Sequence, residues 1–394
     1  MQIESIELKD FRNYEYLKTD FYEGVNLIYG DNAQGKTNIL EAIYIAATTR
    51  SHRGARDEEL IRVDDLCDEQ AVFGNEKDAH IKLFVKKEYS TDRIDIHLKK
   101  NRPKGFAVNG VPLKRLSDIF GILQVIFFCP EDLDIIRRGP GVRRHFLDMD
   151  ISRMNGIYLK SLIDYNKILD SRNKLLKSMA FKRKDSDDDT LDILDLQLVK
   201  YGSEVIDTRR DYTDKLKEKI KEIHGSLSGG KERLEIIYEP SAESAYFEEE
   251  LKKSRQKDLR SGQTAAGPHR DDFTFLINGK DIRKFGSQGQ KRTAALSLKL
   301  AEIDITASVT GEAPVLLLDD VFSELDRSRQ EYLIGCIGDL QTFITCTGND
   351  DILKTRIKVD GMFNVSNGKV TKETWRRNKS VRKATVRRRP DTGS

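Results

Sequence analysis

The sequence predicts an α/β fold in which one head is assembled from both ends of the chain and a helical arm is inserted between them. Three observations lead to this fold class. A short apolar strand and a glycine-rich loop lie near the N-terminus, VLLLDD (315–320) gives a second buried strand near the C-terminus, and apolar residues recur at helical spacing from about 150 to 224. The two ends are therefore expected to share one sheet.

Composition restricts the class of protein. The chain has 394 residues, 34% of them charged and 38% hydrophobic, which is enough for two domains and a large core. The net charge is only +3, so any basic surface is local. No apolar run approaches the roughly 20 residues of a membrane span, the charged N-terminus is unlike a signal peptide, and the cysteines lack CxxC spacing. These features favour a cytoplasmic protein with no membrane partner.

Strand signals dominate the N-terminal part. Apolar residues alternate with charged ones from Ile3 to Leu8, VNLIY (25–29) is a short apolar run that leads into a loop and a helix, and residues 80–85 and 93–98 predict an antiparallel layer. The apolar run from Ile119 to Phe128, ended by Pro130, predicts another buried strand.

The middle of the chain is predicted to be helical. Apolar residues such as Leu159, Leu162 and Leu169 recur at helical spacing, and the charged segment KRKDSDDDT (182–190) predicts the tip between two antiparallel helices. Strand signals return at RLEIIYE (233–239) and at DDFTFLINGKDI, where Asn278-Gly279 is a hairpin turn.

These patterns divide the chain into four parts. We expect the N-terminal part of the head at 1–120, the inserted and mainly helical arm at 121–262, the C-terminal part of the head at 263–370, and a basic, disordered tail at 371–394. The tail is either a phosphate-binding arm or a solvated tail.

GDNAQGKT (30–37) fits the P-loop pattern G-x-x-x-x-G-K-[ST] and lies between a predicted strand and a predicted helix. The glycines let backbone N–H groups curve around a β-phosphate, Lys36 supplies charge to the β- and γ-phosphates, and the Thr37 hydroxyl reaches Mg²⁺. The expected ATP-binding residues here are Gly30, Asp31, Asn32, Ala33, Gln34, Gly35, Lys36, Thr37 and Asn38.

Two adjacent carboxylates end the predicted strand VLLLDD. Asp319 is expected to hold Mg²⁺ together with Thr37, and Asp320 to orient the attacking water. The guanine-specificity pattern NKxD is absent, since NKIL, NKLL and NKSV all lack the aspartate.

A third motif separates ABC-type ATPases from other P-loop proteins. The segment SQGQ (287–290) stands at a predicted helix start shortly before the acidic strand, and Ser323 to Asp326 (SELD) fits a D-loop. In ABC-type heads the signature helix of one subunit faces the γ-phosphate held by the P-loop of the other. Ser287, Gly289 and Gln290 are therefore expected to contact the nucleotide of a second copy, in a symmetric head-to-tail dimer driven by ATP.

Further segments resemble one family. FRNY (11–14), SHR (51–53), PEDLDII (130–136), RRHFLD (143–148) and GPHRDD (267–272) stand, with the nucleotide motifs, where the RecF family has them. The chain resembles this family of SMC-related ATPases over roughly residues 1 to 370. It departs at RRGP (137–140), where the family more often has glycine at the position of Arg138, which puts the local turn in question.

The resemblance implies an ABC-type ATPase head with an inserted arm, DNA binding, slow DNA-stimulated ATP hydrolysis, and loading of recombinase onto gapped DNA with RecO and RecR. It implies a role in DNA replication, repair, recombination and the SOS response, at the nucleoid. Asp320 occupies the place of the catalytic glutamate of transporter ATPases, and Thr347 that of their switch histidine. Because both residues are shorter or altered, we expect slow turnover, with Lys36 as the third catalytic residue. Arg12 is expected to contact nucleotide, by similarity to related heads.

The DNA contacts are expected among five basic residues, because a duplex is held mainly through its phosphates. These candidates are His52, Arg53, Arg56, Arg143 and Arg144. The resemblance implies double-stranded or gapped DNA as the partner, while the sequence itself does not choose between duplex, junction and single strand. We expect little preference for base sequence, since no recognition-helix or zinc-finger pattern stands out.

Two other functions are compatible with the ATP motifs. One is the nucleotide-binding subunit of an ABC transporter, which does not account for the helical arm or for FRNY and GPHRDD. The other is an SMC-like tether that binds ATP without turning it over, although the arm lacks sustained heptads.

Overall fold

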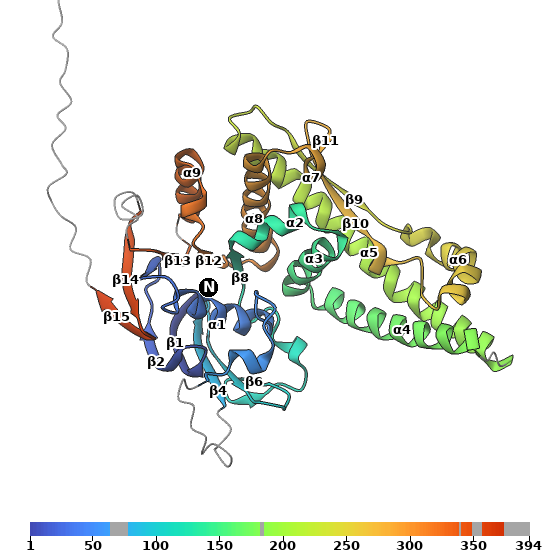
Figure 1. Cartoon of the computed structure of the whole chain (residues 1–394), viewed down its shortest axis with the longest axis horizontal. Helices are drawn as coiled ribbons and strands as arrows, with labels where there is room; N and C mark the ends of the chain where they lie inside the picture. The colour runs from blue at the N-terminus through green and yellow to red at the C-terminus, as the bar shows by residue number, and fades with distance from the viewer. Residues whose placement is uncertain (64–77, 182–184, 339, 349–356, 374–394) are drawn as a thin grey trace, which may run out of the picture.

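The computed structural model describes residues 1–63, 78–181, 185–338, 340–348 and 357–373. Figure 1 shows a head formed by both ends of the chain and an arm that projects from it to one side. The arm consists of the helices α4 (Gly156–Phe181), α5 (Asp185–Leu227) and α6 (Phe247–Ser261). The predicted fold class is confirmed.

A six-stranded sheet forms the centre of the head. Its spatial order is β15 (Lys369–Glu373), β14 (Val359–Ser366), β3 (Val25–Tyr29), β13 (Thr342–Cys346), β12 (Val315–Asp319) and β8 (Val125–Phe128). All neighbouring pairs are parallel except β14 with β15. The sheet thus joins N-terminal strand β3 to C-terminal strands, as the two apolar runs predicted, and it brings the ends of β3 and β12 to one edge.

An antiparallel sheet covers one side of this central sheet. Its order is β2 (Tyr14–Asp20), β1 (Gln2–Phe11), β4 (Ala79–Lys86), β5 (Thr91–Leu98), β6 (Gly105–Val108) and β7 (Val111–Pro112). Alternate residues of β1, including Ile3, Ile6 and Leu8, are buried, as period-two alternation requires. They pack with the P-loop helix α1 (Lys36–Thr48) against the central sheet.

The other side of the central sheet carries helices and a small third sheet. The helices are α2 (Leu133–Arg137), α3 (Pro140–Met154), α7 (Ile282–Phe285), α8 (Gln288–Thr310) and α9 (Arg327–Ile337). The third sheet has the order β11 (Lys280–Asp281), β10 (Asp272–Ile277) and β9 (Leu234–Glu239), and Asn278 and Gly279 form its hairpin turn, both at positive φ.

Neighbouring residues of β12 pack into different cores. Leu316 and Leu318 lie in the core with α5 and α8, whereas Leu317 lies in the core with α1 and the antiparallel sheet. The strand is buried at every position, which explains why its sequence is continuously apolar instead of alternating.

Two of the expected segment boundaries differ from the structure. Strand β8 lies within the range 121–262 assigned to the arm, but it pairs with β12 in the head sheet. Strand β9, assigned to the arm, pairs with β10, assigned to the head. Both boundaries depend on strand pairing between segments that are distant in sequence. The helical periodicity used to delimit the arm carries no information about that pairing.

The tip of the arm is also shorter than predicted. Helix α5 begins at Asp185, so most of the segment 182–190 is helical, and residues 182–184 lie outside the described part of the chain. Acidic residues near the N-terminus of a helix are favoured by its dipole, so an acidic sequence such as DSDDD is compatible with a helix start. The expected tail lies outside the described residues from 374 onward.

The turn at RRGP, where the sequence departs from the RecF family pattern, has room for a side chain. Arg138 ends α2 in an extended conformation with φ of −82°, so glycine is not needed there. Its guanidinium forms an ion pair with Asp134.

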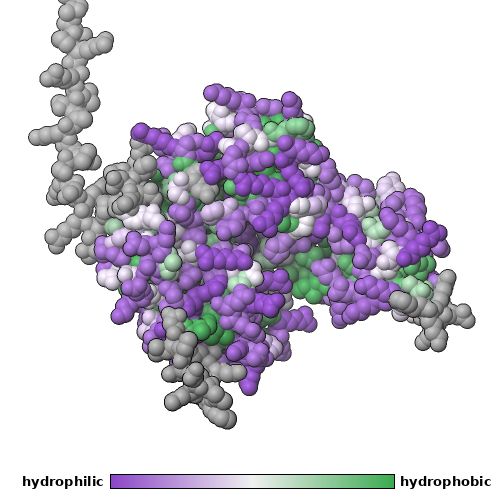
Figure 2. Space-filling view, viewed as in Figure 1, coloured by the Kyte–Doolittle hydropathy of each residue, from purple (hydrophilic) through white to green (hydrophobic). Residues whose placement is uncertain are grey.

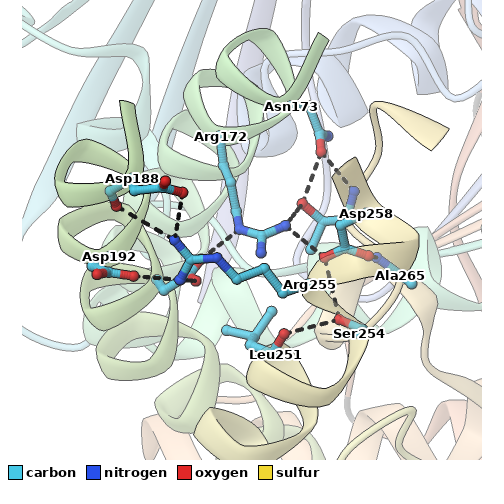
Figure 3. Close-up of polar contacts among 11 residues, drawn as sticks. Arg172, Asn173, Asp188, Asp192, Leu251, Ser254, Arg255, Asp258 and Ala265 are labelled. Atoms are coloured by element: carbon cyan, nitrogen blue, oxygen red, sulfur yellow. Dashed lines mark hydrogen bonds and ion pairs between the residues drawn. The ribbon is translucent and has the colours of Figure 1, made fainter. Parts of the chain in front are cut away.

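A buried arginine connects the three helices of the arm (Figure 3). Arg172 of α4 is fully buried and donates to Asp195 of α5 at 2.5 Å and to Asp258 of α6 at 2.8 Å. Arg255 of α6 joins the same cluster through Asp195, 3.9 Å away, and also pairs with Asp192 on α5. Because removal of one partner leaves an uncompensated buried charge, such a cluster favours a single packing of the three helices.

The surface of the molecule is mainly hydrophilic. Figure 2 shows only small, separated hydrophobic patches on the face in view. Among the described residues, no helix combines the length and hydropathy needed to cross a bilayer.

Candidate nucleotide site

The P-loop connects β3 to α1 and has the backbone conformation expected of a phosphate-binding turn. Gly30 and Gly35 have φ of 151° and 113°, and Ala33 also lies at positive φ, 62°. A Cβ at Gly30 would lie 2.2 Å from the carbonyl oxygen of Val365, so only glycine fits. Lys36 donates from Nζ to the carbonyls of Gly30 (2.7 Å) and Asp31 (2.8 Å), which holds its ammonium group over the loop.

The FRNY segment supports the loop from one side. Asn13 donates to the carbonyl of Gln34 at 2.8 Å and accepts from the Asn38 amide at 2.8 Å, while the Tyr14 hydroxyl donates to the carbonyl of Gly35 at 3.0 Å. A Cβ on Gly35 would collide with both side chains. Sequence reasoning did not assign these two residues a role, because nothing in the local pattern links residues 13 and 14 to a loop about 20 positions later.

The β14–β15 turn supports the loop from another side. The backbone N–H of Asn367 donates to Oε1 of Gln34 at 2.5 Å, and Gly368 packs so closely on Asn13 that a Cβ would lie 2.6 Å from its carbonyl oxygen. Strands from both ends of the chain thus fix the conformation of the P-loop.

The predicted acidic pair is divided between two environments. Asp319 is buried, and its Oδ1 accepts from the hydroxyls of Thr37 (2.8 Å) and Thr345 (2.7 Å). Asp320 has an exposed side chain and a positive φ of 52°, and its N–H donates to Thr345. One carboxylate therefore joins the P-loop threonine, and the next points outward. Adjacent hydroxyl and carboxylate oxygens are ligands that Mg²⁺ accepts, so Thr37 and Asp319 fit a magnesium site.

Arg12 lies beside the P-loop helix and is already paired. Its Nε and Nη2 contact the two carboxylate oxygens of Glu41 at 2.9 Å each, and Nη1 donates to the carbonyl of Glu59. Burial opposes ionisation of Glu41, but hydrogen bonds from Arg12 and Ser51 hold the pKa of this carboxyl below its ordinary value. The structure places Arg12 at the second turn of α1, and its contact with nucleotide stays a prediction.

The signature turn caps the long helix α8. Ser287 Oγ accepts from the N–H of Gln290 at 3.2 Å, and Oε1 of Gln290 accepts from the N–H of Ser287 at 2.8 Å, which is a capping box. Ser287 is exposed. Within the part of the chain that the structure describes, no hydrogen bond joins residues 287–290 to residues 30–38.

The remaining predicted site residues follow β12 and β13. Ser323 donates to the carbonyl of Asp320 at 2.8 Å, and Asp326 caps α9 by accepting from the N–H of Arg329 at 3.0 Å. Thr347 comes directly after β13 and is exposed. All three therefore lie at the edge of the central sheet where Asp319 and the P-loop meet.

The five candidate DNA contacts differ in their exposure to solvent. Arg53 and Arg56 are exposed. Arg143 is buried and makes a bidentate ion pair with Asp272, so its prediction as a phosphate contact was wrong. Arg144 is half-buried and donates to the carbonyl of Asp271 at 2.7 Å. His52 packs its ring against Phe127, with centroids 4.3 Å apart, and burial lowers its pKa.

His269, in GPHRDD, has a structural environment at the joint of head and arm. Its Nε2 donates to the carbonyl of Thr264 at 3.0 Å, so the neutral ring accepts from the Tyr165 hydroxyl at Nδ1, 2.7 Å away. Burial is the largest cause that lowers the pKa of His269 below its ordinary value. The unfolded state therefore binds the proton at higher pH than the folded state does, and stability is lost as the pH falls below about 6.5.

We expect the free energy of unfolding to decrease between pH 7.5 and pH 5.5, and to decrease less in His269→Gln, because glutamine can keep both hydrogen bonds without titrating. Urea unfolding followed by circular dichroism at both pH values measures the difference. An equal loss in the parent and the variant would contradict the assignment.

Comparison with known proteins gives a consistent result. The family model described as the RecF/RecN/SMC N terminal domain matches residues 2–371. The DNA replication and repair protein RecF of Lachnospira eligens is 52% identical over 95% of this chain and 100% of its own length, and that of Agathobacter rectalis is 51% identical over 94% and 99%.

Solved structures agree with these relatives. The recombination mediator RecF with ATP, from the RecFOR pathway, superposes with a TM-score of 0.85 at 40% identity, covering 94% of this chain and 97% of that one. The Smc head of Pyrococcus furiosus, with a TM-score of 0.53 at 18% identity over 94% and 96% of the two chains, shares the fold.

Proposed function

Because this chain belongs to the RecF family of ABC-type ATPases, we propose that it is an ATP-dependent recombination mediator that acts on DNA in replication and repair. One observation carries the nucleotide part of the proposal. The Thr37 hydroxyl and the Asp319 carboxylate, separated by 282 positions in sequence, meet at 2.8 Å directly beneath a P-loop whose lysine is in place. The family resemblance carries the part that concerns DNA.

ATP fits this site through groups that the chain supplies itself. The N–H groups of residues 30–37 and the start of α1 would hold the phosphates, and Lys36 would neutralise their charge. Thr37 and Asp319 would hold Mg²⁺, and the ion would offset the negative charge of the phosphates.

A second copy of the chain completes the site in this proposal. Ser287 is exposed at the N-terminus of a 23-residue helix. Free N–H groups and the positive end of the helix dipole make such a terminus an anion site. The absence of hydrogen bonds to the protein's own P-loop, among the described residues, favours the γ-phosphate of a partner as that anion, with Gly289 and Gln290 beside it. Twofold symmetry then gives two such sites per dimer.

Hydrolysis releases the dimer. Asp320 lies one residue after the magnesium ligand with its carboxylate exposed, so it is the group that would orient the attacking water, while Ser323, Asp326 and Thr347 border the same edge. The short Asp320 and the neutral Thr347 limit the rate, as suits a switch.

DNA is the partner that this switch would control. Arg53 and Arg56 are the exposed candidates for phosphate contacts, with Arg144 a partial one. RecO and RecR belong to the proposal through the family, together with gapped DNA, stimulation of hydrolysis by DNA, and a place at the nucleoid in the cytoplasm.

The transporter alternative is not favoured, since the relatives that match over the full chain are DNA replication and repair proteins. The tether without turnover differs from the proposal only in hydrolysis, so the rate of phosphate release separates the two.

The test is solution mass by light scattering, with no nucleotide, with ADP and with a slowly hydrolysed ATP analogue, each with and without duplex DNA. A shift from monomer to dimer only with the triphosphate supports the proposal, and further dimer on addition of DNA supports the DNA switch. A monomer under every condition, despite bound nucleotide, would leave an ordinary P-loop ATPase.

Replacement of Asp320 by asparagine is expected to slow ATP hydrolysis by about 10²-fold or more, because the water loses its orienting carboxylate. Pairing should persist longer than in the parent after ATP is added. Phosphate release and light scattering on one sample measure both effects, with Asp304→Asn, an exposed acid on α8, as the control. Hydrolysis at the parent rate would remove Asp320 from this role.

A further inference from the structure

A chain of side chains connects the signature turn to the end of the arm helix α5. Gln290 donates from Nε2 to Oε1 of Glu232 at 2.9 Å, and Oε2 of Glu232 accepts from Nε2 of His224, 3.3 Å away. His224 lies in the last turn of α5 and meets Ser297 of α8 through Nδ1 at 3.0 Å. Glu232 itself stands between α5 and β9 and belongs to neither element.

Glu232 reinforces the orientation that the Gln290 amide has in the capping box. The capping box requires the carbonyl oxygen of this amide to face the N–H of Ser287, and its Oε1 accepts there at 2.8 Å. The NH₂ group must then face away, toward Glu232. A carboxylate only accepts hydrogen bonds, so it favours this orientation and disfavours the flipped one. Ser287 and Glu232 therefore select the same orientation from the two sides of the amide, and without Glu232 only the Ser287 N–H, among the described contacts of Gln290, would select it.

Partial burial strengthens the hydrogen bonds that Glu232 accepts. The His224 side chain is 0% exposed and that of Glu232 is 24% exposed. Hydrogen bonds to a charged group that is partly shielded from water are stronger than those between neutral groups. The same carboxylate also accepts a hydrogen bond from His224 of α5. This helix has 43 residues and runs from the tip of the arm to the signature. Glu232 is thus in contact with both the arm and the capping box.

We propose that Glu232 is a positioning residue for the signature: it orients Gln290, and through Gln290 it sets the Ser287 turn that receives the triphosphate of a second copy. Through His224 it connects this turn to the arm. The inference rests on the proposed function, since it assigns a role within ATP-driven pairing.

The test compares Glu232→Ala, Gln290→Ala and the double variant. Glu232→Ala should weaken dimerisation with the ATP analogue by about tenfold, the range of a hydrogen bond to a charged group, while monomer affinity for nucleotide changes less than twofold. The double variant should be no weaker than Gln290→Ala alone, because Glu232 acts through Gln290. Glu235→Ala is the matched control: its side chain is 27% exposed and ion-paired with Arg233.

Hydrogen exchange separates this inference from the proposed function. In the nucleotide-free monomer, the backbone amides of Ser287 and Gln290 should exchange faster in Glu232→Ala than in the parent. The increase should equal the increase at the Ser287 amide in Gln290→Ala. If the parent fails to dimerise but this result holds, the proposed function is wrong and the positioning role stands. Additive losses in the double variant, or unchanged exchange at both amides, would overturn the role of Glu232.

Discussion

Replacement of Ser287 by arginine should abolish ATP-driven dimerisation while nucleotide binding to the P-loop stays within about twofold of the parent. The residue caps α8 and is exposed, and it makes no hydrogen bond to residues 30–38 within the described chain. An arginine there keeps the helix but fills the space in front of its N-terminus, where the γ-phosphate of a partner would lie. Loss of the cap itself costs about 1 kcal/mol, too little to unfold the head.

The measurement pairs titration of a fluorescent nucleotide with light scattering in the ATP analogue. Ser308→Arg is the matched control, since Ser308 is exposed near the other end of the same helix. Dimerisation of the Ser287→Arg variant at parental strength would show that the signature does not face a partner. Loss of nucleotide binding would instead place Ser287 at its own P-loop.

The sequence was sufficient for the local parts of the site. A P-loop, its lysine and its threonine are fixed by spacing within eight residues, and the acidic pair is fixed by the end of a buried strand. The structure brings Thr37 and Asp319 together because β3 and β12 both end at the same edge of one parallel sheet, separated only by β13. Motif and strand pattern together were therefore enough to predict that contact.

Contacts that join distant segments could not be predicted. Arg143 is of a residue type that often binds phosphate. Its burial and its ion pair with Asp272, 129 positions later, are visible only in the tertiary structure. The side chains of Asn13 and Tyr14 support the P-loop by donating to its backbone carbonyls, and no periodicity encodes these contacts. Glu232 is one of many acidic residues in the sequence, and its role depends on where α5 ends. In each case the deciding partner is set by the tertiary fold.

Lys36→Ala should weaken ATP binding by about 10- to 100-fold, which is the effect of losing hydrogen bonds to a charged group. The lysine is 9% exposed and donates to the carbonyls of Gly30 and Asp31, so the P-loop already holds its ammonium group where phosphates bind. Lys36→Arg should also bind less well, because a planar guanidinium cannot replace a compact ammonium in this tight turn. Pairing should decrease with binding in both variants.

Thermal unfolding with and without ATP tests the predicted loss of ATP binding independently of pairing. A ligand present at about 100 times its Kd stabilises the folded state by about 2.7 kcal/mol, so the parent should melt at a higher temperature with ATP. At the same ATP concentration, the melting temperature of Lys36→Ala should rise little. That of Lys86→Ala, at an exposed lysine of β4, should rise as much as that of the parent. The variant can lose ATP and keep its fold, because the loop is supported separately by Asn13, Tyr14 and the β14–β15 turn. An ATP-dependent shift equal to that of the parent would mean that nucleotide binds without Lys36, and the P-loop would then not be the primary site.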